Sequence, residues 1–285
     1  MKKKFMKLCS LVMVAAITLS LAGCGNNNSG NSSSSEKSEE DVLKVGMECA
    51  YAPFNWTQTD DSNDAVEIEG GGYASGYDVM IAKKIADGLG KKLVIVKTEW
   101  DGLSPAITSG KIDMIIAGMS ATSERKETLD FSDNYYTSDL VVVVKKDGDF
   151  AKAKTINDFK GAKITAQLNT FHYTVIDQMK DVDKQTALEN FPDMIVALQS
   201  GKIDGYISEK PGALSAVAAN DDLSYVEFGE GDGFEYNTDE VSIAVGLKKG
   251  SELTDKVNDI LSEISEDDRD EMMKEAIKTQ PVNAN

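Results

Sequence analysis

The 285-residue chain is poor in cysteine, histidine and basic residues, and each shortage excludes a class of protein. Three cysteines are too few for a disulfide framework. A single histidine, His172, excludes a histidine-rich metal site and argues against a histidine-based catalytic triad. Only 30 basic residues stand against 48 acidic ones, and the net charge of −18 argues against nucleic-acid binding, which needs Lys and Arg to neutralise phosphates. The 41 % hydrophobic content suffices for one large domain or two of about 100–150 residues.

The first 23 residues have the composition of a targeting signal. Four lysines, at positions 2, 3, 4 and 7, precede an apolar run over residues 8–22. The run ends in Leu21-Ala22-Gly23-Cys24, which resembles a bacterial lipobox. We therefore predict a lipoprotein signal peptide over residues 1–23 and a lipid (palmitate) anchor on Cys24. The alternatives are an ordinary secretory signal or a short transmembrane anchor, although the run is shorter than the ~20 residues that usually span a bilayer.

Residues 24–41 are predicted to be a flexible tether, because the stretch after Cys24 contains Gly, Asn, Ser and charged residues but no apolar one. Removal of residues 1–23 takes away four lysines and no acid, so the net charge falls from −18 to −22. Anionic lipid would repel such a surface. We therefore expect the protein to be held at the outer face of the cell membrane by its lipid alone. Cys49, the one remaining cysteine, is predicted to be a small buried residue.

From Val42 onward, short β-rich runs alternate with amphipathic helical stretches, which predicts an α/β fold with largely parallel sheets. The clearest helix covers residues 78–89, where Val79, Ala82 and Ile85 share one stripe and Gly90 follows as a C-cap. Further helices are predicted at 170–179, 194–199, 212–219, 252–264 and 267–279, and strands at 43–47, 93–97, 112–116, 140–145, 162–165, 204–207 and 242–247.

A pentapeptide occurs twice, as Ser-Gly-Lys-Ile-Asp at 109–113 and at 200–204. Each copy follows a helical stretch and precedes a predicted strand, and its glycine suits a helix C-cap. A chance match is the alternative, but the matched flanks favour a duplicated architecture. Continuing both strands leads to Gly118 and Glu209 at equivalent positions. Because ligands of open α/β sheets bind beyond the carboxyl ends of strands, we expect these two ends to face each other across a cleft.

Several longer motifs stand in order along residues 43–277. They are Tyr51-Ala52-Pro53-Phe54, Gly76-Tyr77-Asp78-Val79, Trp100-Asp101-Gly102-Leu103, the run from Gly110 to Arg125, and Phe131-Ser132. Together they resemble the polar-amino-acid solute-binding proteins of ABC importers, family 3. The resemblance implies a two-lobe type II fold with a ligand cleft, delivery of the ligand to an ABC permease and its ATPase, and no cofactor or metal. It places lobe 1 at 42–139 plus 241–285, lobe 2 at 140–240, and a two-strand hinge near 137–141 and 238–242.

A free amino acid presents a carboxylate, an ammonium and a side chain, and a specific site needs a partner for each. Arg125 can hold a carboxylate bidentately, Ser120 can donate a hydroxyl, and backbone N–H groups near Gly118 are free to point at an anion. The resemblance gives this carboxylate-binding role to the matching stretch, which includes Ala117. The local sequence Ser-Glu-Arg-Lys-Glu leaves an alternative for Arg125, a solvated helix-end charge with an intrahelical partner.

In the second lobe, Gln167 to Thr170 lies between a predicted strand and a helix that Thr170 can cap. The family usually has Gly-Thr here. Asn169 replaces that glycine, and asparagine tolerates a left-handed backbone, so the loop can survive. Phe171 follows and is expected to narrow the pocket.

Glu209 matches the family position whose carboxylate, most often Asp, pairs with the ligand ammonium. The alternative reading is a surface acid paired with Lys210.

Tyr51 and Trp100 match ligand-stacking positions, whereas Phe54 is expected in the core. Glu48 matches a position where the family often places an acid that reaches the ligand side chain. An acid there favours a cationic side chain, although a carboxylate also accepts hydrogen bonds from glutamine.

Other readings carry less support. Asp60-Asp61-Ser62-Asn63-Asp64 lacks the glycine of an EF-hand loop, since Ala65 stands there, and is interpreted as a solvated loop without a metal. A cyclohexadienyl dehydratase-like enzyme would need Glu209 or Glu48 as its general acid. An amino-acid sensor is the other alternative. We predict a monomeric binding protein, not an enzyme, that takes up a polar, cationic L-amino acid.

Overall fold

The computed structural model describes residues 42–281 of the chain. The predicted signal peptide (1–23), Cys24 and the predicted tether (24–41) lie outside these residues. Within the described part, no helix has both the length and the apolar character needed to cross a membrane.

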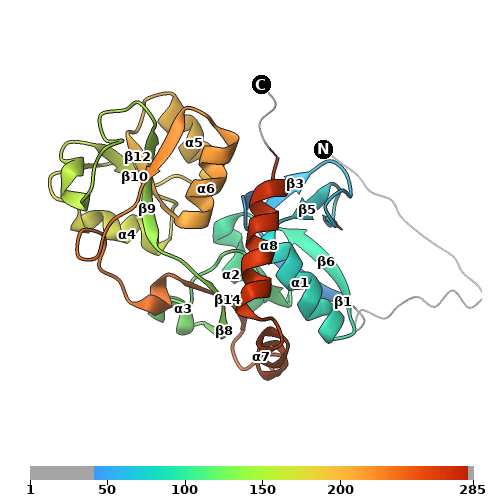
Figure 1. The fold of residues 1–285 in the computed structure, drawn as a ribbon. Helices are drawn as coiled ribbons and strands as arrows, with labels where there is room; N and C mark the ends of the chain where they lie inside the picture. The colour runs from blue at the N-terminus through green and yellow to red at the C-terminus, as the bar shows by residue number, and fades with distance from the viewer. Residues whose placement is uncertain (1–41, 282–285) are drawn as a thin grey trace, which may run out of the picture. The chain divides into compact units, whose positions relative to one another are not determined.

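The first lobe is built on a five-stranded sheet with the order β6-β1-β7-β14-β8 (Figure 1). Its strands are β1 (Val42–Met47), β6 (Lys92–Lys97), β7 (Met114–Ile115), β8 (Leu129–Thr137) and β14 (Ser242–Lys248). A small antiparallel sheet joins it, formed by β2 (Ala50–Tyr51), β3 (Asn55–Gln58), β5 (Tyr73–Ser75) and β4 (Val66–Glu67). The helical segments of this lobe are α1 (Tyr77–Gly88), η2 (Trp100–Gly102), α2 (Leu103–Thr108), α3 (Ser123–Lys126), α7 (Thr254–Ser262) and α8 (Glu266–Thr279).

The second lobe repeats this arrangement with a sheet of order β11-β10-β12-β9-β13. Its strands are β9 (Leu140–Lys145), β10 (Lys163–Thr165), β11 (Asp183–Lys184), β12 (Gly205–Glu209) and β13 (Leu223–Val226). Its helical segments are η3 (Ile156–Phe159), α4 (Phe171–Val175), η4 (Ile176–Gln178), α5 (Phe191–Gln199), α6 (Lys210–Ala219) and η5 (Thr238–Glu240). The two-lobe α/β fold predicted from the sequence is therefore confirmed.

The prediction of largely parallel sheets is wrong. In each five-stranded sheet three neighbouring strands are parallel, and the remaining two pairings, to β14 and β8 or to β9 and β13, are antiparallel. The small sheet is antiparallel throughout. The alternation of apolar and polar residues shows that a strand exists but carries no information about its direction.

The repeated pentapeptide has the same structure in both lobes. Gly110 and Gly201 follow α2 and α5 with φ angles of 77° and 74°, the left-handed conformation expected of a C-cap glycine. Asp113 and Asp204 each exchange two hydrogen bonds of 2.8 Å with one residue of the neighbouring strand, β1 and β10 respectively. The matched bonds confirm the duplicated architecture.

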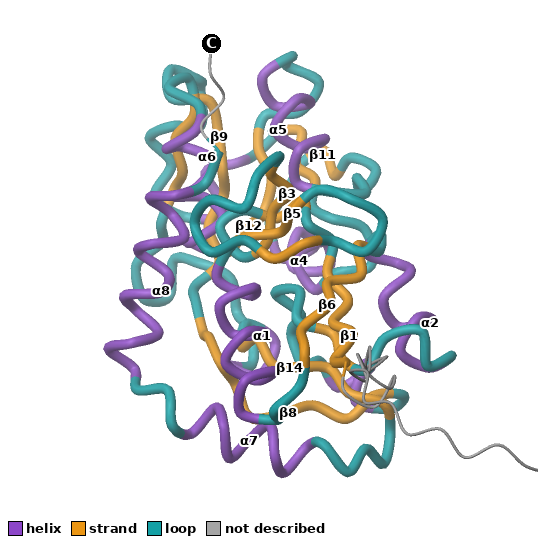
Figure 2. Tube along the Cα trace, turned by 90° about the vertical axis from the view of Figure 1, so that its right-hand side faces the viewer, coloured by secondary structure: helices purple, strands orange, loops and turns teal. Residues whose placement is uncertain are grey.

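The chain crosses between the lobes twice, from β8 to β9 and from β13 to β14. The crossings lie side by side, because the hydroxyls of Thr137 and Ser242 are 2.9 Å apart and Ser138 N–H donates to the Val241 carbonyl at 3.4 Å. The hinge role of these segments and the residue limits of the lobes stay predictions. Helix α8 connects the lobes again: it lies beside α1 and ends at α6, where Gln280 donates to the Ser215 carbonyl at 3.2 Å (Figures 1 and 2).

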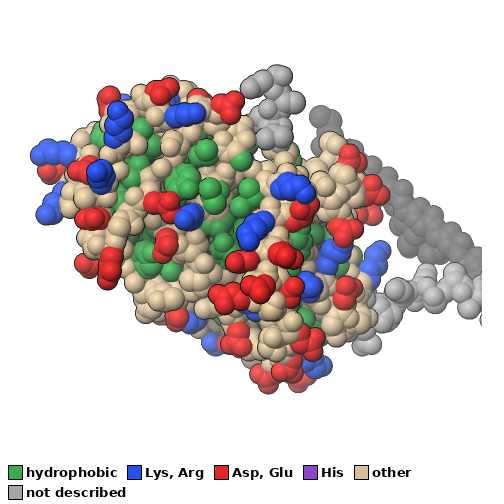
Figure 3. Space-filling model, viewed as in Figure 1, with side chains coloured by type: hydrophobic (Ala, Val, Ile, Leu, Met, Phe, Trp, Pro, Cys, Tyr) green, Lys and Arg blue, Asp and Glu red, His purple; other side chains and the backbone are tan. Residues whose placement is uncertain are grey.

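Most predicted elements occur within a few residues of their expected limits. The predicted stripe of α1 is buried, and Gly90 beyond it has φ 66°. The predicted helix 170–179 is α-helical only to Val175 and continues as a 3₁₀ turn. Cys49 and Phe54 are buried, as expected. Strands β8, β11 and β13 and the small sheet were not predicted. On the face shown in Figure 3, basic side chains are interspersed with acidic ones.

Candidate ligand-binding site

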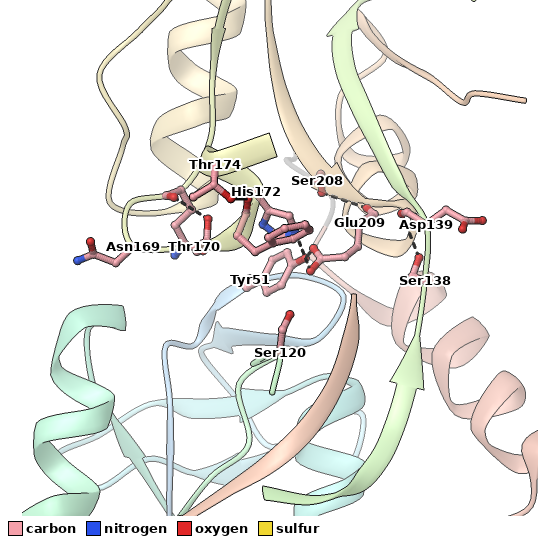
Figure 4. Close-up of polar contacts among 12 residues, drawn as sticks. Tyr51, Ser120, Ser138, Asp139, Asn169, Thr170, His172, Thr174, Ser208 and Glu209 are labelled. Carbon is pink, nitrogen blue, oxygen red and sulfur yellow. Dashed lines mark hydrogen bonds and ion pairs between the residues drawn. The ribbon is translucent and has the colours of Figure 1, made fainter. Parts of the chain in front are cut away.

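The candidate site lies where the ends of strands from both lobes meet. Glu48 directly follows β1, and residues 117–120 follow β7 in the first lobe. Gln167 follows β10, and Glu209 is the last residue of β12 in the second. Figure 4 shows Tyr51 and Ser120 of the first lobe beneath His172 and Glu209 of the second. The expected meeting of the two strand ends is thus observed.

Glu48 and Gln167 form one contact between the lobes, and both are 3 % exposed. The Gln167 amide donates to both carboxylate oxygens of Glu48 at 3.2 Å and to the Glu189 carbonyl at 3.0 Å. Burial raises the pKa of Glu48 to about 7, although the hydrogen bond from Gln167 opposes the rise. A positive group placed beside this carboxyl would keep it ionised at neutral pH.

Glu209 forms a second contact and is 2 % exposed. Its Oε2 accepts a hydrogen bond from the Tyr51 hydroxyl, and its Oε1 lies 2.9 Å from Nε2 of His172. Burial acts to raise the pKa of Glu209, but the positive charge and hydrogen bond of His172, with the Tyr51 bond, hold it below its usual value. The alternative pairing with Lys210 is wrong, because Lys210 pairs with Glu227 and Glu209 points inward.

The ring of Tyr51 is enclosed by both lobes. It stacks on Phe191 with 3.9 Å between ring centroids and 8° between planes. A Cβ atom added at Gly118 would lie 3.0 Å from this ring, and one added at Gly212 would lie 3.1 Å from it. Both glycines therefore leave the space that the ring occupies.

Arg125 forms a third contact. Its guanidinium donates to the Ser120 carbonyl at 2.9 Å and to the Asn169 carbonyl of the second lobe at 3.1 Å. It also lies over the Trp100 ring, 5.0 Å from the centroid, a cation–π distance. Burial lowers the pKa of Arg125 to about 10, which leaves it charged at neutral pH. Asn169 has φ 55°, so the left-handed backbone expected there is observed, and its amide donates to Asp101 at 2.9 Å.

One expectation about hydrogen bonding, a capping bond from the side chain of Thr170, is wrong. Thr170 occupies the N-cap position of α4, but its hydroxyl donates to the Gln167 carbonyl at 2.7 Å and makes no capping bond. The backbone N–H of Gly118 acts to lower the pKa of the nearby Asp78 carboxyl. Asp78 is buried and also accepts from Asn55 and Tyr135, each at 2.7 Å, and burial raises its pKa to about 6.

Two further predicted site residues, Ala117 and Phe171, pack in or against the apolar cores of the lobes. Ala117 is 1 % exposed and belongs to the apolar core of the first lobe. Phe171 is half-buried and packs against the core of the second. Residues 60–64 are exposed, and across residues 42–281 no group of three or more His, Cys, Asp or Glu side chains is arranged to hold a metal.

Sequence reasoning missed His172 as a site residue. The signal was present, since the sole histidine stands two positions after Thr170, in the first turn of a predicted helix that follows a site loop. It was also not foreseen that Asp78, inside one of the matched motifs, would be buried and accept hydrogen bonds from Asn55 and Tyr135.

Comparisons with known proteins agree with this geometry. Residues 43–278 match the family model of the bacterial extracellular solute-binding proteins, family 3. A "Probable histidine-binding protein" from Campylobacter jejuni is 34 % identical over 82 % of this chain and 86 % of its own length. The "Arginine-binding extracellular protein ArtP" from Bacillus subtilis is 29 % identical over 94 % of this chain and 97 % of its own.

A solved structure of an amino acid ABC transporter substrate-binding protein from Streptococcus pneumoniae, bound to L-arginine, superimposes with a TM-score of 0.74 at 30 % identity. The superposition covers 85 % of this chain and 96 % of the Streptococcus pneumoniae chain. The chain therefore belongs to family 3 of the bacterial extracellular solute-binding proteins, as its motifs indicated. The members of this family bind solutes outside the cytoplasm for transporters, so the prediction that the protein is not an enzyme is confirmed.

Proposed function

We propose that the protein is the substrate-binding component of an ABC importer and that its two lobes close on a polar L-amino acid with a cationic side chain. The observation that carries this proposal is that three charged groups, Arg125 of α3, Glu209 at the end of β12 and Glu48 just after β1, each contact the opposite lobe where the two lobes meet. One cation and two anions suit a ligand that carries one carboxylate and two positive groups. The relatives named for arginine and histidine binding support the same class of ligand.

Each end of the ligand would have its own partners. Arg125, with the hydroxyl of Ser120, would bind the α-carboxylate, because a guanidinium fork matches a carboxylate. The carbonyls that now accept from Arg125 are neutral and can yield to a charged acceptor. Glu209 would accept the α-ammonium beside Tyr51. Because these groups come from both lobes, the ligand would favour the arrangement in which the lobes are in contact.

Glu48 would select the side chain. A buried carboxyl whose pKa is about 7 is about half ionised at neutral pH, and a guanidinium or ammonium next to it would complete the ionisation. Trp100 would add a cation–π contact. Glutamine is the competing ligand, because Glu48 already accepts hydrogen bonds from the amide of Gln167.

The membrane attachment is proposed from the sequence. Cys24 would carry the lipid, the tether over residues 24–41 would link it to the lobes, and the protein would act as a monomer with an ABC permease and its ATPase. Substitution of Cys24 by alanine should release the protein from the membrane fraction into the medium. A C24A protein that stays with the membrane would refute the lipid anchor.

The function is tested with a thermal-shift panel of the twenty amino acids on residues 25–285, unfolded and refolded first to remove co-purified ligand. A ligand at 100 times its dissociation constant should add ~2.7 kcal/mol to the free energy of unfolding. Stabilisation by arginine, lysine or histidine supports the proposal. Stabilisation by glutamine or cystine alone would keep the class and refute the role of Glu48. No stabilisation by any amino acid would refute amino-acid binding.

A further inference from the structure

His172 and Glu209 form a buried ion pair in the second lobe that the matched motifs do not include. His172 lies in the first turn of α4, Glu209 ends β12, and the side chains are 9 % and 2 % exposed. Nε2 of His172 lies 2.9 Å from Oε1 of Glu209, while Oε2 binds the Tyr51 hydroxyl. Figure 4 shows the imidazole and the phenol meeting the carboxylate from opposite lobes.

Within residues 42–281, His172 is the one cationic side chain at ion-pair distance from Glu209. Arg125 and Asp78 act on Glu209 through their charge, but the Arg125 guanidinium is bonded to two carbonyls. On the other side of α4, Asp177 of η4 pairs with Lys184 near the surface. A buried carboxylate is costly without a counter-ion, and an imidazolium at His172 would supply one to Glu209.

The other nitrogen of His172 has no such support. Nδ1 is buried and has no hydrogen-bond partner among residues 42–281. A protonated imidazole would bury an unpaired N–H there, which costs about 1–3 kcal/mol. Of the two ring nitrogens, only Nε2 faces a negative charge in the described part of the chain, so a second proton on the ring would lose its support once another cation pairs with Glu209.

We propose that His172 is a resident counter-ion of Glu209 that the ligand ammonium replaces. The inference rests on the proposed function, in which Glu209 accepts the α-ammonium. When the ligand binds, the ammonium pairs with Glu209, the imidazolium gives one proton to the solvent, and neutral His172 keeps donating from Nε2–H. Ligand binding and His172 protonation then compete, so affinity rises with pH by up to about tenfold per unit until the ring is neutral.

Because His172 is the only histidine of the chain, imidazole ¹⁵N NMR of an untagged protein reports its protonation without overlap. In the protein alone, E209Q should lower the pH at which the ring loses its proton. Saturating L-arginine should do the same in the wild-type protein. Should E209Q leave that pH unchanged, the counter-ion role would be refuted whether or not an amino acid binds. If arginine binds and leaves it unchanged or raises it, the exchange would be refuted.

Calorimetry in buffers of different ionisation enthalpy counts the protons released when L-arginine binds. Burial brings the pKa of Glu48 to about 7 and that of Asp78 to about 6, so the comparison uses variants that each remove one ionisable group. E48Q should still release protons, and H172Q, whose amide can donate to Glu209 but cannot be protonated, should release fewer than the wild-type protein. Equal release by H172Q and wild type would overturn the proposal while the proposed function stands. If the wild-type protein binds no amino acid of the panel, both the proposed function and the exchange are refuted. The counter-ion role is then still decided by the E209Q titration.

Discussion

Replacing Glu48 by glutamine should stabilise the protein and at the same time weaken its binding of cationic amino acids. Glu48 is 3 % exposed, and glutamine has nearly the same shape. Its side-chain carbonyl can still accept the hydrogen bond that Gln167 donates to Glu48 at 3.2 Å. The substitution therefore removes the ionisable group and leaves the packing in place.

The size of the effect on stability follows from burial, which raises the pKa of Glu48 from 4.5 to about 7. Between these values the carboxyl is protonated in the folded protein and ionised in the unfolded chain, so folding takes up a proton and stability falls as pH rises. At about 1.36 kcal/mol per unit, the full shift corresponds to roughly 3 kcal/mol. E48Q escapes this loss, so we expect a gain of roughly 3 kcal/mol at pH 8 and less than about 1 kcal/mol at pH 5.

Urea unfolding at both pH values measures this gain, and calorimetry measures binding. Hydrogen bonds to charged groups contribute about 1.5–3 kcal/mol, so E48Q should bind arginine about 10–150 times more weakly and glutamine nearly as well as before. The matched control is E99Q, an exposed glutamate whose charge acts on Glu48. It should change the free energy of unfolding and the arginine-to-glutamine preference only slightly. If E48Q is no more stable than wild type at pH 8, the burial argument is refuted. If arginine and glutamine lose affinity equally, Glu48 is not the selector.

Three further substitutions test other contacts of the site and of the lobes. R125K keeps the charge but loses the guanidinium fork. Calorimetry should therefore show that every amino acid binds about 10–100 times more weakly, with the order of preference unchanged. A loss of affinity for arginine alone would contradict the carboxylate-binding role of Arg125. G212A would place a Cβ atom 2.7 Å from Ser208 Oγ and 3.1 Å from the Tyr51 ring, so denaturant unfolding should show a loss of about 1–3 kcal/mol despite the better helix propensity of alanine. Q280A removes a 5 % exposed side chain that binds Ser215 and should cost about 1–3 kcal/mol in the same assay; an unchanged midpoint would show that α8 is not fastened to α6 there.

The sequence allowed prediction of features that depend on neighbours along the chain. Periodicity located α1 and seven of the ten strands in the two five-stranded sheets, and the asparagine at position 169 correctly indicated a left-handed loop. Strand β8, with the sequence LDFSDNYYT, was missed because polar residues interrupt its apolar alternation. The contact of Tyr51 with Glu209 joins residues 158 positions apart, and no local pattern records such a pairing. The same limit explains why His172 was considered only for a metal site or a catalytic triad and not as a partner of Glu209.

The two lobes repeat one fold but differ in the residues at two equivalent positions, and Tyr51 contacts both of these residues. Each lobe carries the same Ser-Gly-Lys-Ile-Asp turn with the same strand-joining hydrogen bonds, and the positions equivalent beyond the two turns are Gly118 and Glu209. Tyr51 contacts both: its ring would lie only 3.0 Å from a Cβ atom at residue 118, and its hydroxyl donates to the carboxylate of residue 209. Two copies of one architecture can supply two strand ends that face each other, but a polar ligand needs different groups at its two ends. The divergence at these equivalent positions, an absent side chain in one lobe and a buried acid in the other, lets one aromatic residue of the first lobe reach into the second.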